Sequence, residues 1–200
     1  RKGDYLPKKT RDGRKMRPGN LPGIMPGPED TYQSYGYGWA NASNTPYRMF
    51  KQFNHEGGIR TPMIAHWPEG IQDRGTLVRS VSHLIDIMPT VLEVCQVEAA
   101  ETINGKQAVV PDGHSLADAF QGRRVDDHGT LFFHHARGRA LRQGNWKVVS
   151  ASGGKWELYN LAKDPLELID LAQTYPDRLQ QLVAAWQVES KRHASQAELK

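Results

Sequence analysis

Four short segments that favour β-strands follow one another between Leu131 and Tyr159, and turn residues separate them. The connecting stretches include Gln143-Gly144-Asn145 and Ser152-Gly153-Gly154, which are typical of hairpin turns. Because such turns join neighbouring antiparallel strands, the sequence predicts a small antiparallel sheet of about four strands. The predicted strands are 131–135, 139–142, 146–150 and 155–159.

An amphipathic helix is predicted after the sheet. Pro176 can occupy its first position, and Asp177 places a negative charge in its first turn. Apolar residues then recur at i, i+3, i+4 and i+7, namely Leu179, Leu182, Val183 and Trp186. We expect this helix to cover one face of the sheet.

The region before the sheet has a different character. Residues 59–67 form a short apolar run between Gly58 and Pro68, which predicts a buried strand, although Pro62 confines it to an edge or to the start of a strand. Residues 86–95 predict a helix with one apolar face, and a shorter helix is expected at 115–120. A strand followed by a helix is the alternation of an α/β sheet domain.

Proline and glycine alternate through residues 1–38, which predicts an irregular loop. The change of pattern near residues 123–130 predicts a domain boundary. We therefore expect an α/β domain in residues 1–122, beginning with this loop, and a small α+β domain in residues 123–200.

The charge distribution limits the classes of partner. The net charge of the 200 residues is +4, and residues 1–17 alone carry +6. A basic arm could bind nucleic acid or an acidic polymer, but it holds one aromatic residue, Tyr5, so a platform for base stacking is not indicated. No apolar run approaches the ~20 residues that span a bilayer. We expect neither a nucleic-acid nor a membrane partner.

One motif is more specific than these patterns. The stretch Thr45-Pro46-Tyr47-Arg48-Met49-Phe50-Lys51 is followed closely by His55-Glu56-Gly57-Gly58. It resembles the segment that sulfatases carry shortly after their metal-binding Asp-Asn-Gly. Further blocks that resemble this family follow in the same order as in sulfatases: Ser82–Thr90, Asp112–Leu116, Arg139–Lys147, Trp156–Leu161 and Asp164-Pro165 with Glu167.

The resemblance covers residues 39–170 and implies the C-terminal portion of an arylsulfatase in the alkaline-phosphatase-like superfamily. The fold expected from it is an α/β remnant of that sheet domain, followed by a small α+β domain with an antiparallel sheet and a C-terminal helix. The implied activity is hydrolysis of a sulfuric ester.

Three residues are candidates for the site. Lys51 matches the sulfatase lysine that contacts the substrate sulfate, and an ammonium there would stabilise negative charge on the ester oxygens. His135 matches a histidine near the substrate cleft, but adjacent strand residues point to opposite faces, so at most one of His134 and His135 faces a pocket. His55 is either a substrate-binding residue or a structural one. Gly57-Gly58 suggests a tight backbone approach, and Glu56 is expected to order that turn.

Sulfatases also use a formylglycine nucleophile, made from a cysteine or serine in a Cys/Ser-x-Pro/Ala-x-Arg context, and usually a calcium ion. The nucleophile motif is absent, because Cys95 does not stand in that context. The metal-binding Asp-Asn-Gly does not occur either. The resemblance therefore implies calcium and formylglycine for a longer protein, with its N-terminal part as the partner of this chain. We expect the 200 residues alone to be inactive.

The resemblance further implies a small-molecule or sugar sulfate ester as substrate and a periplasmic or secreted location. Two alternatives remain open from the sequence. One is a phosphonate or phosphate monoester hydrolase of the same superfamily, and the other is a non-catalytic module that binds anions or polysaccharides through the basic arm.

Overall fold

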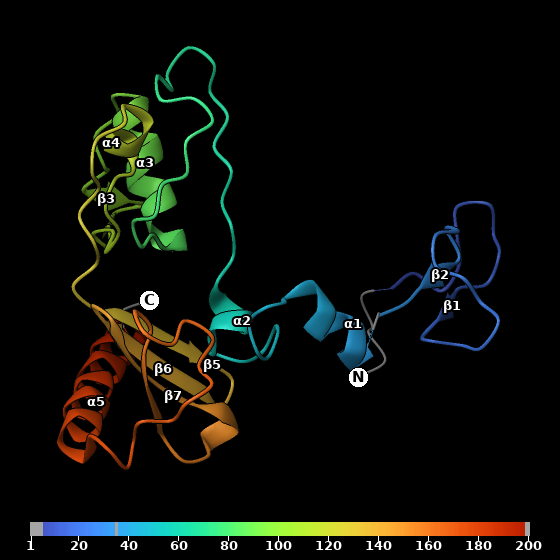
Figure 1. Cartoon of the computed structure of the whole chain (residues 1–200). Helices are drawn as coiled ribbons and strands as arrows, with labels where there is room; N and C mark the ends of the chain where they lie inside the picture. The colour runs from blue at the N-terminus through green and yellow to red at the C-terminus, as the bar shows by residue number, and fades with distance from the viewer. Residues whose placement is uncertain (1–5, 35, 199–200) are drawn as a thin grey trace.

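The computed structural model describes residues 6–34 and 36–198, in three parts that follow one another along the chain (Figure 1). An N-terminal arm, residues 6–34, extends to one side of the molecule. Helix α1 (Gly36–Ser43) lies between this arm and the rest. The helical unit, residues 60–122, and the sheet unit, residues 125–198, lie together on the other side.

The sheet unit is built on four antiparallel strands in the order β5-β6-β7-β8, which confirms the sheet predicted from the turns. Between β6 and β7, Gln143 pairs with Trp146 across a two-residue turn in which Gly144 has a positive φ of 56°. The strands are β5 (Leu131–His135), β6 (Gly138–Gln143), β7 (Trp146–Ser150) and β8 (Glu157–Asn160). A short 3-10 turn, η2 (Ala151–Gly153), precedes β8.

Helix α5 (Pro176–Glu198) covers one face of this sheet, as predicted. The core beneath it is made of buried apolar residues from the sheet and the helix. Its members are Leu141, Val148, Leu158, Leu182 and Trp186. Trp186 also donates a hydrogen bond from its indole N–H to the carbonyl of Phe133 at 3.2 Å. The helix is therefore tied to the sheet by apolar burial and by one polar contact.

The opposite face of the sheet is also covered. Alternation along the strands places Ala140, Val149 and Tyr159 there, all fully or almost fully buried. Helix α2 (Glu56–Ile59) and the residues before it pack on this side. We call residues 48–59 the Lys51 segment. The sheet thus lies between α5 on one face and the Lys51 segment on the other.

The helical unit contains the helices predicted there. A 3-10 turn, η1 (Leu84–Asp86), leads into α3 (Ile87–Val94), and α4 (Ala117–Phe120) follows a two-stranded hairpin. The hairpin is β3 (Thr102–Ile103) with β4 (Lys106–Gln107). The buried carboxylate of Asp86 accepts hydrogen bonds from the backbone N–H groups of His83 and His114, so it joins the start of α3 to a segment 28 residues away.

The predicted strand at 59–67 is wrong. Ile59 ends helix α2, and residues 60–67 run as irregular, mostly exposed backbone. Ile64 is 92% exposed. The physical reason is that a strand needs a neighbour for its backbone groups, and among residues 6–34 and 36–198 none lies beside this run.

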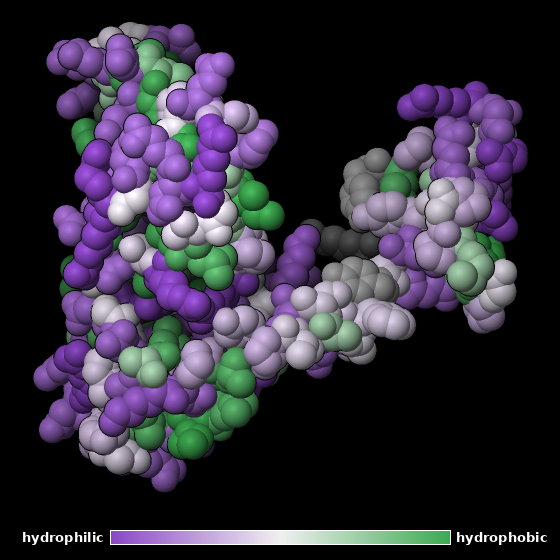
Figure 2. Space-filling view, turned by 45° about the horizontal axis from the view of Figure 1, so that its top comes forward, coloured by the Kyte–Doolittle hydropathy of each residue, from purple (hydrophilic) through white to green (hydrophobic). Residues whose placement is uncertain are grey.

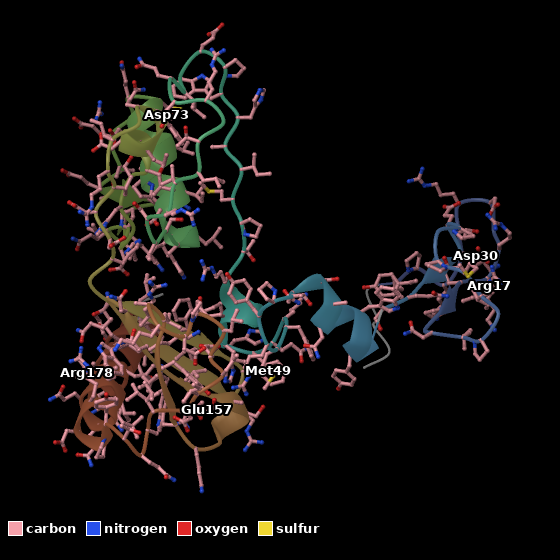
Figure 3. The ribbon with its side chains drawn as sticks, viewed as in Figure 1. Arg17, Asp30, Met49, Asp73, Glu157 and Arg178 are labelled. Carbon is pink, nitrogen blue, oxygen red and sulfur yellow. The ribbon has the colours of Figure 1, made fainter. Side chains whose placement is uncertain are left out.

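The arm is mostly irregular, as its proline and glycine content predicts. Two-residue strands β1 (Arg17–Pro18) and β2 (Thr31–Tyr32) pair in parallel. Arg17 donates to Asp30 at 2.6 Å, and Figure 3 shows the two side chains together. The basic residues Arg1 and Lys2, with Tyr5, lie outside the described residues.

Apolar side chains remain open on the surface of the helical unit. A groove of about 410 Å³ lies between residues 63–71 and α3, and its lining includes Ile64, Trp67 and Val91. The apolar face of α3 is not covered, so Cys95 just beyond it is exposed as well. Figure 2 shows green hydrophobic patches open on this side of the molecule.

Candidate functional site

Lys51 lies in an exposed turn with Gln52. The backbone around it is held in an unusual conformation, because Met49 and Gln52 have positive φ values of 67° and 90°. In the part of the chain that the structure describes, no hydrogen bond or ion pair engages the Lys51 ammonium. The turn therefore presents a free cation to solvent.

The back of this turn packs against two glycines. A Cβ atom on Gly57 would overlap the carbonyl oxygens of Arg48 and Met49, and one on Gly58 would overlap that of Phe53. Only glycine allows this approach of one backbone to another. The close backbone approach expected at Gly57-Gly58 is therefore present, and both glycines lie within helix α2.

Glu56, directly before these glycines, is anchored in the sheet. Its Oε1 atom lies 2.8 Å from the Nζ atom of Lys147 on β7, and the same Nζ lies 2.8 Å from Oε1 of Glu167. Glu167 also accepts the backbone N–H of Glu56 at 2.7 Å. All three side chains are at most 5% exposed. One buried ammonium thus joins two buried carboxylates.

A second group of contacts fixes the Lys51 segment on both sides of the turn. Arg48 donates to the Tyr159 hydroxyl at 3.1 Å and to the carbonyl of Glu167 at 2.6 Å. His55 is fully buried, and its Nε2 lies 3.1 Å from Oε2 of Glu157. Figure 3 shows Met49 beside the part of the sheet that carries Glu157.

The pKa values on this face follow from the same contacts. The hydrogen bond with His55 holds the pKa of Glu157 below its usual value despite partial burial, and the Tyr159 hydroxyl adds to the effect. Burial, together with donation to Glu157, raises the pKa of Tyr159. Glu157 therefore remains a carboxylate and Tyr159 a neutral donor at neutral pH.

The structure separates the two neighbouring histidines of β5. The His134 ring lies 5.7 Å from that of Trp186, on the α5 side of the sheet. His135 is the next strand residue and therefore points to the side of the Lys51 segment. It is exposed, and its pairing partner Gly138 lies against Asn54. Lys51 and His135 are thus both exposed on the same side of the sheet.

His55 has a different environment from these two residues. It has no exposed surface, and no hydrogen bond or ion pair links it to Lys51 or His135, all three of which are described. Its burial favours the structural alternative over direct substrate contact.

Sequence reasoning missed the residues that anchor the Lys51 segment, namely Arg48, Lys147, Glu157, Tyr159 and Glu167. One signal was available for Lys147: it stands in the strand Trp146-Lys147-Val148-Val149, and a lysine in such an apolar run needs a buried partner. Glu167 carries no comparable local signal, because its environment comes from residues far away in the sequence.

The described residues do not fit a calcium ion. They contain no group of three or more histidine, cysteine, aspartate or glutamate side chains in a metal-holding arrangement. The buried carboxylate of Asp86 already faces the N–H groups of His83 and His114 and the ring of His128 at 2.9 Å. Asp127 accepts the backbone N–H of Val81. Of the helices described, none is long and apolar enough to cross a membrane.

Comparison with known proteins gives a consistent family. The family model described as "N-sulphoglucosamine sulphohydrolase, C-terminal" matches residues 46–193. An uncharacterized sulfatase of Schizosaccharomyces pombe is 38% identical over 164 residues, which cover 77% of this chain and 29% of that protein. Human arylsulfatase D is 34% identical over 104 residues, covering 52% of this chain and 16% of that protein. The chain thus spans less than a third of either relative.

A solved structure shares the fold. The crystal structure of Ps i-CgsB in complex with k-i-k-neocarrahexaose superposes with a TM-score of 0.58 at 23% identity. The match covers 73% of this chain and 32% of that one.

Proposed function

Because this chain belongs to the sulfatase family, we propose that it forms the C-terminal part of a sulfuric ester hydrolase and supplies the lysine that contacts the sulfate group. One observation carries the proposal: Lys51 is exposed and unpaired on a turn whose flanking residues are bound to the buried face of the sheet. A mobile surface lysine would not need such support.

In this proposal the Lys51 ammonium lies against the sulfate oxygens. Cleavage of a sulfate ester moves negative charge onto the leaving oxygen, and a fixed cation stabilises that charge more than the charge of the ground state. His135, exposed on the same side, lines the cleft and contributes to substrate selection. His55 supports the segment from beneath, which its contact with Glu157 favours.

The rest of the chemistry is proposed to come from outside these residues. A formylglycine hydrate would supply the nucleophile, and a calcium ion would bind the sulfate. The described donor set does not fit such an ion, so the proposal places both groups in the N-terminal part of the enzyme. We expect residues 1–200 to be inactive by themselves and to act together with the N-terminal part of a sulfatase, in the periplasm or outside the cell.

The open groove of the helical unit supports this arrangement. Among the described residues, the backbone of 61–66 makes no hydrogen bond, and the groove between residues 63–71 and α3 is apolar. Both features are typical of a sheet layer whose neighbouring strands come from elsewhere in the protein. We propose that the N-terminal part of the enzyme covers this surface.

The proposed substrate is a sulfate ester of a sugar or of a small molecule. The protein whose structure shares this fold was crystallised with k-i-k-neocarrahexaose, a carbohydrate, which supports the sugar among these choices. The exposed position of Lys51 and His135 leaves room for a bulky group next to the ester.

The test is a substitution in the longest polypeptide that the gene encodes around residues 1–200. Lys51→Ala is compared with Lys163→Ala, an exposed lysine in a surface turn, using p-nitrophenyl sulfate and p-nitrophenyl phosphate. We expect Lys51→Ala to lower kcat on the sulfate ester by about 10²–10³-fold, the usual effect of losing one charge-stabilising group, and Lys163→Ala to leave it unchanged. Equal activity of the two variants, or hydrolysis of the phosphate ester alone by the unmodified protein, would overturn the proposal.

A further inference from the structure

Lys147 places a fully buried ammonium in the middle of the small sheet, far along the chain from Lys51. We propose that Lys147 is a positioning residue for Lys51: it holds the segment that presents Lys51 to the substrate. This inference rests on the proposed function of Lys51 and adds a role for a residue that touches neither substrate nor reacting atoms.

The first step is the contact of Lys147 with helix α2. Its Nζ lies 2.8 Å from Glu56, which opens α2, and 2.8 Å from Glu167, which in turn accepts the backbone N–H of Glu56 at 2.7 Å. The first residue of α2 is therefore bound through its side chain and its backbone. None of these three groups has water to replace a lost partner, because all are buried.

The second step leads from α2 to the turn. Gly57 and Gly58 lie against the backbone carbonyls of residues 48–53, with no space for even a Cβ atom between them. A displacement of α2 must therefore move the backbone of the Lys51 turn as well. Lys51 lies five residues before Glu56, within the stretch that the glycines support.

The third step concerns the other end of the segment. Arg48 binds the Tyr159 hydroxyl and the carbonyl of Glu167. Glu167 thus contributes its side chain to one end of the turn and its backbone to the other. Lys147 holds that side chain in place, so it acts on both sides of Lys51 through a single partner.

A charged group at this position is costly if stability alone is considered. Buried ion pairs can often be replaced by apolar side chains without loss of stability, whereas removal of one partner leaves an uncompensated charge. Lys147→Met would leave Glu56 and Glu167 facing each other as two carboxylates, which repel. We expect α2 to move away from the sheet and the Lys51 turn to lose its fixed conformation.

The experiment is a double-mutant cycle in the longest encoded polypeptide, with Lys51→Ala, Lys147→Met and both together. Lys155→Met, an exposed lysine before β8, is the matched control and should keep full activity. If Lys147 acts through Lys51, Lys147→Met lowers kcat/KM at least tenfold in the presence of Lys51 and less than twofold in its absence. A purely structural role would lower kcat/KM by the same factor in both backgrounds, and that result would overturn the inference.

A second readout does not depend on activity. The hydrogen-bonded N–H groups of the segment include that of Phe53, which donates to the carbonyl of Phe50, and that of Glu56, which donates to Glu167. The amide hydrogen exchange of these two groups should accelerate at least tenfold in Lys147→Met, while that of β6 and α5 stays unchanged. Unchanged exchange at Phe53 and Glu56 would contradict the inference. If Lys147→Met does not fold, Glu167→Gln enters the same cycle, because it keeps an acceptor for the Glu56 N–H and removes one charge.

The failures of the two proposals are distinguishable. Full activity of Lys51→Ala would reject the proposed function itself. Loss of activity in Lys51→Ala, combined with an equal effect of Lys147→Met in both backgrounds, would reject only the positioning role.

Discussion

His55 and Glu157 are 102 residues apart in the sequence, yet Nε2 of the histidine lies 3.1 Å from Oε2 of the glutamate. The same oxygen accepts the hydroxyl of Tyr159 at 2.5 Å. This contact attaches the Lys51 segment to β8, on the same face of the sheet as Lys147. It also accounts for the complete burial of His55, a residue that the sequence left open between binding and support.

The contact predicts a pH dependence of stability. Since the folded protein holds the pKa of Glu157 below its ordinary value of 4.5, the contribution of Glu157 is complete above pH 4.5 and is lost as the pH falls through the lowered pKa. We expect Glu157→Gln to be less stable than the unmodified chain at pH 7. The difference should shrink below pH 4.5. Urea denaturation at a series of pH values measures it, and a difference that stays constant down to pH 3 would contradict the assignment.

Gly57 should not tolerate a side chain. Gly57→Ala would place a Cβ atom onto the carbonyl oxygens of Arg48 and Met49, which are backbone atoms and cannot rotate away. We expect the free energy of unfolding to fall by about 1–3 kcal/mol, the range found for overpacked sites. Gly129→Ala is the control, since nothing lies within 4 Å of its added Cβ. Chemical denaturation measures both, and equal stability of the two variants would argue against this packing.

The sheet unit should depend strongly on Trp186. This residue is 8% exposed, stacks on Phe132 and donates to the carbonyl of Phe133. Trp186→Ala should lower the free energy of unfolding by about 3–5 kcal/mol, as for other large-to-small core changes. Val188→Ala, on the exposed side of α5, should change it by less than about 0.5 kcal/mol. A similar melting temperature for the two variants would show that α5 does not cover the core.

Asp86 should hold the helical unit together. Burial acts to raise its pKa, but hydrogen bonds from His128 and from the backbone of His83 and His114 lower the pKa overall. Asp86→Ala leaves buried donors without an acceptor, which costs about 1–3 kcal/mol. We expect faster proteolysis within residues 80–128, with Asp126→Ala, an exposed aspartate, as the unaffected control. Because the pKa of Asp86 is lowered, its contribution is complete above the ordinary value of 3.8, and acid below that pH should mimic the substitution.

The parts of the fold that could be predicted are those specified by neighbouring residues. The turn at Gly144 and the spacing of Leu182 and Trp186 act over a few residues, so the antiparallel sheet and α5 follow from them. The strand expected at 59–67 depended on neighbours that the run itself does not contain. Local apolarity was therefore insufficient to predict its pairing.

The residues of the candidate site also fall into two groups, those that a short motif identifies and those that only long-range contacts bring together. Lys51 and Gly57-Gly58 were identified because they belong to one short motif, and the backbone approach expected at the glycines is present. The roles of Lys51 and His135 in substrate contact remain predictions. Lys147 and Glu167 could not be connected with Glu56 from the sequence, because their contacts cross 91 and 111 residues. Only the folded sheet brings these charges together.

The long separation between Glu56 and Glu167 also has a consequence for synthesis. Glu167 leaves the ribosome 111 residues after Glu56, a delay of about 6–22 s at translation rates of about 5–20 residues per second. Throughout that time the Lys51 turn has no Glu167 to anchor it. A chain terminated by a premature stop codon after β8 but before residue 167 would retain Lys51 and all four strands, yet it would lack the group that fixes both ends of the turn. The Lys51 turn can therefore reach its final conformation only after the C-terminal region has been synthesised.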